Sequence, residues 1–441
     1  MGEGESEWAL IGRLAESGPM RNVHLGLDRE HVLAIVGKRG SGKSFTLGVL
    51  LEGLCASRRE SSISASTKER ATLLFDTLNI FQWMTAPVTA DSPSAHVAQQ
   101  RVDLSRWNLE AEELDVDLWV PAGFEDQVTG RALPFRIRTW EMQASDWAAL
   151  LKVDATQDVM GQLITATVER VRSKGWTRAD GSAVAPQAEY TIGALLDCLS
   201  EDSMISTDFA PSTIRAVRQR LSAYDASPLF GSDGTSLAEL LRPGRLSVLL
   251  LSGVPDDVRA VVVYLTLRKL MQARARASEA SKSLELGFAT DRDERIRCET
   301  ILAEAPPKTW VVIDEAQNVF PAERATAASE TLLKFVREGR NFGLSLAFTT
   351  QQPTALDARV MAQVDTFIVH TLTVDRDIKS VTQNLKSREP NRLALSGRPI
   401  TLSEGVRDLA IGQAMLSSTD ATRSMFLDIR PRVSVHGGYE S

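Results

Sequence analysis

Short apolar runs recur along the chain, and each ends at a glycine or at polar residues. Uninterrupted short runs of this kind are typical of strands buried on both faces of a parallel sheet. The runs are His31–Val36, Thr72–Phe75, Arg245–Ser252, Trp310–Ile313 and Leu344–Phe348. Helical patterns follow at Phe45–Leu54 and Asp256–Ala277. This alternation predicts an α/β fold with a largely parallel sheet flanked by helices.

The pattern becomes helical in the middle of the chain. Apolar side chains recur there at helical spacing, as at Val159, Leu163, Ile164, Val168 and Val171. We therefore predict a mainly helical insertion that interrupts the core. The predicted divisions are an N-terminal segment (1–30), the first part of the core (31–122), the insertion (123–241), the second part of the core (242–415) and a C-terminal tail (416–441).

Two further local predictions concern the connections. Val23–Asp28 and His31–Val36 are expected to form a hairpin that leads into the first core strand. Glu279–Lys308 is charged and contains Pro306 and Pro307, so it is expected to form a surface loop.

The first apolar run leads into the strongest motif. Gly37–Ser44 has the pattern G-x-x-x-x-G-K-S between a predicted strand and helix, as in a phosphate-binding loop. Backbone N–H groups and the helix N-terminus favour an anion there. Lys43 can reach the β- and γ-phosphates, and Ser44 can ligate Mg²⁺. We expect ATP and Mg²⁺ to bind at Gly37, Lys38, Arg39, Gly40, Ser41, Gly42, Lys43, Ser44 and Phe45.

An acidic pair follows the fourth run. Asp314 and Glu315 come directly after Trp310–Ile313, where the carboxyl end of a parallel strand meets ligands. Asp314 suits a place just outside the direct ligands of Mg²⁺, and Glu315 suits a base that orients and activates water. Paired with the loop at Gly37–Ser44, this indicates hydrolysis rather than nucleotide binding alone.

The fifth run ends in Thr349-Thr350-Gln351-Gln352-Pro353. An amide at this strand end would face the γ-phosphate, although a polar turn before Pro353 is the alternative. Arg337 and Arg340 lie just upstream. Such arginines are usually solvated, but a ring-forming ATPase needs a cation delivered by the neighbouring subunit.

Several segments together resemble the HerA branch of the HerA–FtsK translocases. The resemblance extends from about His24 to Gly438 and is weakest between roughly residues 123 and 240. The segments that carry it are Leu74–Phe81, Ile313–Asn318, Arg337–Gly343, Thr350–Pro353, Asp365–His370 and Arg430–Gly438.

This resemblance implies a RecA-like, hexameric motor that pumps double-stranded DNA through its central channel using ATP. It implies that Arg340 is an arginine finger acting in trans and that Gln351 senses the γ-phosphate. In related translocases two loops line the pore. Here they would carry Arg324 and Arg359, for which an ordinary surface role is the equal alternative.

Three features depart from the family pattern. Only a short segment precedes Gly37, so we expect the family's N-terminal β-barrel to be absent, and a nuclease partner is less certain because that barrel commonly docks one. Gln352 and Thr371 stand where the family usually has arginine. Any nuclease or other effector is expected to be a separate chain.

Composition agrees with a cytoplasmic motor. The chain has 441 residues, 43% of them hydrophobic, and lacks an apolar run of membrane-spanning length or a secretory signal. Cys55, Cys198 and Cys298 are far apart and read as reduced structural thiols. The net charge of −7 argues only mildly against DNA binding, because a ring needs few cations per subunit facing its pore.

Three functions are therefore weighed. The leading one is a hexameric DNA-translocating ATPase or helicase, as the motor subunit of a DNA-processing or antiphage defence complex. The alternative is a ring-forming regulatory ATPase that scaffolds a separate effector without translocating DNA. A protein-remodelling ATPase is the third, but no substrate-adaptor feature supports it.

Overall fold

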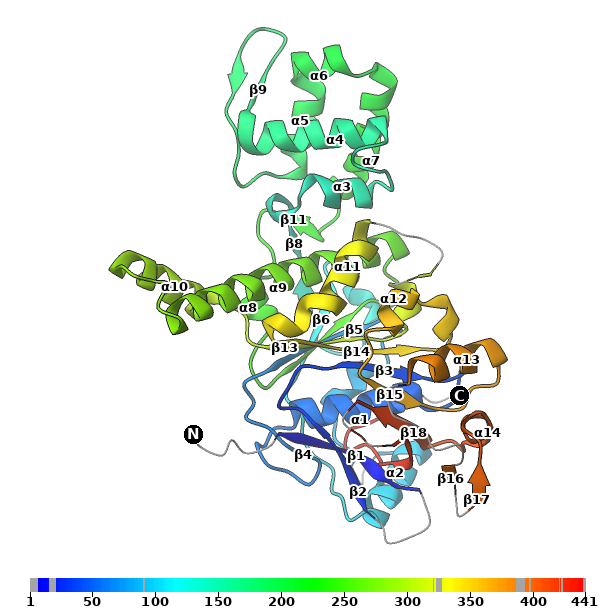
Figure 1. Ribbon diagram of the computed structural model, residues 1–441. Coiled ribbons are helices and arrows are strands. Elements are labelled where there is room, and N and C mark those ends of the chain that lie inside the picture. Colours follow the sequence, from blue (N-terminus) through cyan, green and yellow to red (C-terminus); the bar gives the residue numbers. More distant parts are fainter. Residues whose placement is uncertain are drawn as a thin grey trace.

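The structure is a computed structural model that describes residues 7–15, 21–89, 92–319, 321–322, 327–385, 393–395, 398–419, 421 and 423–438. Within these residues the main sheet has thirteen strands in the order β2-β1-β19-β18-β15-β3-β14-β13-β5-β12-β6-β7, with β4 paired to β1. In Figure 1 the helix α1 lies on one side of this sheet, and α9 and α11 lie on the other.

The centre of the sheet is parallel, and its strands are buried on both faces. All residues of β3 and β13 are buried, which explains their uninterrupted apolar sequences. The prediction of an α/β fold with a largely parallel sheet is confirmed. The parallel strands are β15 (Thr366–Val369), β3 (Val32–Val36), β14 (Leu344–Thr350), β13 (Thr309–Ile313), β5 (Ala71–Asp76), β12 (Leu246–Leu250), β6 (Val116–Pro121) and β7 (Leu133–Phe135).

Antiparallel strands from both ends of the chain extend the sheet beyond β15. The predicted terminal segments therefore contribute to the main sheet. The predicted hairpin is wrong, because β2 pairs with β1, whereas β3 lies between β14 and β15. The added strands are β1 (Trp8–Leu14), β2 (Asn22–Gly26), β4 (Ser64–Ala65), β18 (Gln413–Ser418) and β19 (Met425–Ile429).

Helices and one short hairpin complete the core. Among the described residues no helix is both long and apolar enough to cross a membrane. These elements are α1 (Lys43–Cys55), α2 (Ala95–Arg106), α8 (Leu237–Leu240), α11 (Ala327–Glu338), α12 (Ala358–Met361), α13 (Asp375–Asn384), α14 (Leu402–Asp408), β16 (Leu393–Leu395) and β17 (Arg398–Ile400).

The insertion forms a separate helical layer, at the top of Figure 1. The predicted insertion began at residue 123, but the core strand β7 and the short strand β8 (Ile137–Arg138) come first within it. The helices of the insertion therefore begin only after β8. The layer comprises α3 (Ala144–Leu150), α4 (Val159–Glu169), α5 (Ile192–Glu201), α6 (Ser203–Asp208), α7 (Pro211–Asp225), β9 (Trp176–Thr177), β10 (Ala183–Val184) and β11 (Phe230–Gly231), which pairs with β8.

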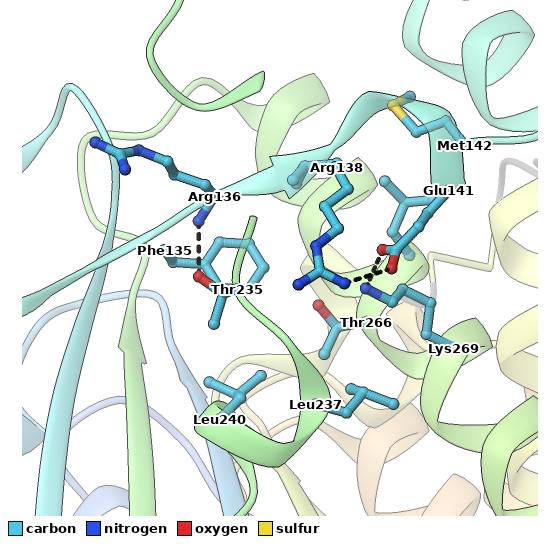
Figure 2. A pocket seen from close by; sticks show the side chains of 12 residues that line it. Phe135, Arg136, Arg138, Glu141, Met142, Thr235, Leu237, Leu240, Thr266 and Lys269 are labelled. Carbon is cyan, nitrogen blue, oxygen red and sulfur yellow. Dashed lines mark hydrogen bonds and ion pairs between the residues drawn. The ribbon is translucent and has the colours of Figure 1, made fainter. Parts of the chain in front are cut away.

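Ion pairs attach this layer to α9. Asp146 accepts a hydrogen bond from Arg268 at 2.7 Å, and both side chains are buried. Figure 2 shows Glu141 between Arg138, at 3.4 Å, and Lys269. The cavity beside them has about 20 Å³ of free space, enough for about one water molecule, so it is no candidate for a nucleotide site.

The helix α9 (Asp256–Glu285) is longer than its apolar pattern predicts, and α10 (Arg292–Glu304) follows it. The prediction of a surface loop over 279–308 is therefore wrong. The helix α10 has no buried residue. A helix that buries no face needs no apolar stripe, which explains why the sequence pattern did not indicate it. In Figure 1 the end of α9 and α10 project together to the left of the core.

Candidate nucleotide-binding site

The loop Gly37–Ser44 joins the buried strand β3 to α1. Gly42 has a φ of 102°, a conformation that side chains rarely adopt, and a Cβ on Gly37 would lie 2.7 Å from Cβ of His370. The loop therefore packs tightly over the end of β15. No acidic side chain occupies the first turn of α1, so the N–H groups there remain suited to phosphate.

The Lys43 side chain lies against this loop. Its Nζ donates to the carbonyl of Lys38 at 3.0 Å, and the residue is buried. Burial lowers the pKa of Lys43, while Glu315 and Asp314 oppose that shift. The ammonium group therefore lies near Glu315, the predicted base, and Asp314, the predicted Mg²⁺ residue.

The other loop residues differ in exposure. Ser41 is buried and donates to the Lys38 carbonyl at 2.7 Å, while Lys38, Arg39 and Gly40 are exposed. Ser44 is half-buried at the start of α1, where a metal-binding hydroxyl is expected. Phe45 is half-buried as well, and its ring meets that of His436 edge-on at 5.3 Å.

Asp314 lies at the end of β13, which is separated from β3 by the single strand β14. Burial and then the charge of Asp76 raise the pKa of Asp314 to about 7. One of its oxygens accepts a hydrogen bond from Thr349 Oγ1 at 2.6 Å, and the buried Oδ2 has no partner among the described residues. A buried carboxylate with an unsatisfied oxygen fits Mg²⁺, which Asp314 and Ser44 would hold.

Glu315 is held by two amides. Gln351 Nε2 donates to its Oε1, and Gln317 Nε2 donates to its Oε2, each at 2.5 Å. Its backbone has a φ of 53°, a strained conformation for a residue with a side chain, and its N–H donates to Thr349 Oγ1 at 2.8 Å. The structure therefore brings Gln351 and Glu315 together, as their places at neighbouring strand ends predict.

Arg340 lies at the opposite edge of the sheet. It belongs to the 3-10 turn η6 (Gly339–Phe342), just before β14 begins, and its Nη1 donates to Asp365 at 2.8 and 2.9 Å. Asp365 in turn accepts from the N–H of Val32, the first residue of β3. The length of β3, about 17 Å, therefore separates Arg340 from the loop that follows β3.

Of the two candidate DNA contacts, Arg324 and Arg359, only Arg359 lies within the described residues. Arg359 is half exposed on α12, and its guanidinium pairs with Asp357 at 2.8 Å. Arg324 lies outside the described residues. The structure therefore places one of the two.

Sequence reasoning missed several residues around the site. His370, at the end of β15, is buried below the loop; its Nδ1 donates to the carbonyl of Gln413, and its Nε2 accepts from Thr46 Oγ1, each at 2.9 Å. Burial lowers the pKa of His370 to about 4, so the ring is neutral. The sequence signal for His370 was its position directly after a buried strand. The signal for Gln317 and Thr349 was that each lies two residues along the chain from a predicted site residue, Glu315 or Gln351.

A phosphate-binding loop after β3, and an Asp-Glu pair after β13 with one strand between them, define a P-loop NTPase with a RecA-like core. Solved structures agree with this fold. VirB4 of Thermoanaerobacter pseudethanolicus matches with a TM-score of 0.52 and 13% identity, covering 97% of each chain. The bacterial conjugative coupling protein TrwB matches with a TM-score of 0.51 and 11% identity, covering 98% of this chain and 91% of its own.

Sequence comparison identifies the family. The model described as "Helicase HerA, central domain" matches residues 9–270, and the one described as "Zonular occludens toxin (Zot)" matches residues 256–374. The chain belongs to the HerA helicase family of P-loop ATPases, which confirms the resemblance. The DNA double-strand break repair helicase HerA of Pyrococcus furiosus is 24% identical over 268 residues, 55% of this chain and 46% of that protein. This chain thus spans about half of that relative's length.

Proposed function

We propose that this protein is the ATP-hydrolysing subunit of a hexameric ring that moves double-stranded DNA through its centre. The observation that carries the proposal is that Arg340 and the pair Lys43 and Glu315 lie at opposite ends of the central strands. A site that needs an arginine finger is then complete only where a second copy of the chain supplies it.

The chemistry follows from the residues around the loop. Lys43 and the N–H groups of α1 bind the phosphates of ATP. Glu315 orients a water molecule, whose oxygen attacks the γ-phosphorus while the bond to the bridging oxygen of ADP breaks; Glu315 takes up the proton. Bound Mg²⁺ would supply charge neutralisation of the phosphate oxygens. Gln351 touches Glu315, so loss of the γ-phosphate can alter the hydrogen bonds of both side chains.

DNA enters the proposal through the HerA helicases that the chain resembles. Arg324 and Arg359, on two predicted pore loops, are the proposed phosphate contacts. Such contacts are electrostatic and nearly indifferent to base sequence. A role as the motor of a DNA-processing or antiphage defence complex, with a nuclease or other effector as a separate chain, belongs to the same proposal.

The test combines ATPase rates with native mass. We expect a hexamer whose ATP turnover rises when double-stranded DNA is added. A hexamer that hydrolyses ATP at one rate with and without DNA would support the scaffold alternative. A monomer with full activity would contradict the ring.

The origin of the finger is tested by mixing two variants that are inactive alone. Arg340→Ala keeps its phosphate-binding loop, and Lys43→Ala keeps its arginine. In mixed rings some interfaces pair the intact loop with the intact arginine, so ATPase activity should return. If native mass spectrometry shows mixed rings and no activity returns at any ratio, Arg340 does not act in trans.

A further inference from the structure

Arg340 is held by a carboxylate that the sheet itself fixes in place. Its Nη1 donates to Oδ1 of Asp365 at 2.8 Å and to Oδ2 at 2.9 Å. Asp365 is the only side chain that the described residues offer as a hydrogen-bonding partner to this guanidinium. The carboxylate side chain is 19% exposed and that of Arg340 is 37% exposed. The pair therefore lies at the surface, with the carboxylate on the inner side.

The backbone around Asp365 leaves its carboxylate little freedom. Oδ2 accepts from the N–H of Val32 at 3.0 Å, and the N–H of Asp365 donates to the carbonyl of Val32 at 2.8 Å. Val32 begins β3 and Thr366 begins β15, two central strands paired in register. Most surface ion pairs join two mobile side chains and contribute little; here one partner is anchored to the sheet.

The turn that carries Arg340 is anchored as well. Arg274 on α9 donates from Nε to the carbonyl of Phe342 at 2.9 Å and from Nη1 to the carbonyl of Pro306 at 3.0 Å. A Cβ on Gly343 would lie 2.7 Å from the Lys308 side chain, so the chain packs closely there. Both the backbone of the arginine and the carboxylate it meets are thus fixed before any neighbour arrives.

We propose that Asp365 is a positioning residue that orients the Arg340 guanidinium toward the nucleotide of the neighbouring subunit. The contact occupies one terminal nitrogen, Nη1, and 37% of the Arg340 side chain stays exposed. A cation oriented in advance stabilises transition-state charge without reorganising during the reaction. The inference rests on the proposed trans role of Arg340 and assigns the residue that makes this role effective.

The variant Asp365→Asn tests this directly. It is isosteric and keeps an oxygen that can accept from the N–H of Val32, but it loses the charge that orients Arg340. We expect the turnover number to fall roughly 10- to 100-fold, as for a displaced catalytic group, while the affinity for ATP stays within about twofold. Asp103→Asn, which breaks the exposed pair with Arg106 on α2, is the matched control and should retain parental turnover.

Complementation separates positioning from a structural effect on β3. If Asp365 acts through Arg340, mixing Asp365→Asn with Lys43→Ala should give activity above the sum of the two alone, because Lys43→Ala supplies a normal finger. Mixing Asp365→Asn with Arg340→Ala should give no gain. The reverse result, gain with Arg340→Ala and none with Lys43→Ala, would mean that Asp365 supports its own subunit's loop, and it would overturn the inference.

A second variant and two further outcomes separate failure of the inference from failure of the proposed ring. If Asp365→Asn does not assemble into rings, Asp365→Glu replaces it: the charge is retained but displaced by one methylene, and the same complementation pattern is expected at a smaller loss. If Arg340→Ala and Lys43→Ala complement each other but Asp365→Asn and Asp365→Glu turn over normally, the inference fails and the proposed ring stands. If Arg340→Ala and Lys43→Ala never complement, the trans role itself fails.

Discussion

Replacing Glu52 by glutamine should destabilise the protein strongly. Glu52 lies on α1, fully buried, where the chain after β19 packs against that helix. It accepts from Arg430 Nη1 at 2.7 Å, from Arg432 Nε at 3.1 Å, and from Val433 N, Ser434 N and Ser434 Oγ at 3.1, 3.0 and 2.7 Å. Both arginines are as buried as the glutamate, so this carboxylate is the negative charge that offsets two cations.

The magnitude follows from removing one member of a buried ionic group. Breaking such a group typically costs about 3–5 kcal/mol, because the remaining charge stays buried without compensation. For a protein of 441 residues, with an unfolding entropy of about 2.1 cal/mol/K per residue, that corresponds to a fall in Tm of roughly 3–5 °C. Glu201→Gln, which breaks the half-exposed pair with Arg178, is the control and should cost less than about 1 kcal/mol.

The assay is thermal unfolding followed at several pH values. Burial alone would raise the pKa of Glu52, but Arg430, Arg432 and Ser434 together lower it below the ordinary 4.5. A lowered pKa gives stability that is fully present above the unfolded-state value and lost as the pH falls through the folded-state value. The Tm difference between Glu52→Gln and the parent should therefore be constant above pH 4.5 and shrink below it. A Tm within about 2 °C of the parent at pH 7 would refute the reasoning.

Three further predictions concern the site. Lys43→Ala should lose most of its affinity for ATP in an equilibrium binding assay, because its ammonium is the proposed contact to the β- and γ-phosphates. Glu315→Gln should bind ATP normally but fail to turn it over; normal turnover would show that another carboxylate is the base. Arg324→Ala combined with Arg359→Ala should weaken DNA binding and flatten its salt dependence while leaving basal ATPase largely unchanged, and an unaltered salt slope would exclude both contacts.

The parallel core and the cluster around the phosphate-binding loop could be predicted because the signals for both lie in short continuous segments of the sequence. Each central strand is a short apolar run, and the carboxyl ends of parallel strands meet at one edge of the sheet. That rule alone brings Gln351 beside Glu315, which the structure shows at 2.5 Å. The roles assigned to these side chains remain predictions.

The antiparallel extension could not be predicted as a whole. Its pairs β1–β2 and β18–β19 are local, but the pairing that joins them, β1 with β19, connects the two ends of the chain. The strand β1 pairs with β19, so Gly12 lies opposite Ile429, and nothing local to either strand signals this. A hairpin between β2 and β3 was the natural short-range prediction. It is wrong because β2 pairs with β1, its other neighbour in sequence, while β3 pairs with the distant strands β14 and β15.

Other features were missed because their signals are weak in sequence. The helix α10 contacts α9 without burying any residue, so its charged sequence has no apolar period. Glu52 reads as an ordinary polar residue in a helix, and only the returning chain makes it the centre of a buried network. A Cβ on Gly48 would lie 2.6 Å from Cζ of Arg432, so that glycine leaves room for the same contact.

The most direct test of the central claim is displacement of a third strand from a DNA triplex placed in the path of the protein. We predict that the parent protein releases the third strand from double-stranded DNA when ATP is present, and that Glu315→Gln, bound to the same DNA with ATP, does not. Release that requires ATP hydrolysis would show movement along the duplex. A hexamer that hydrolyses ATP and binds DNA but leaves the third strand in place would contradict the proposed motor.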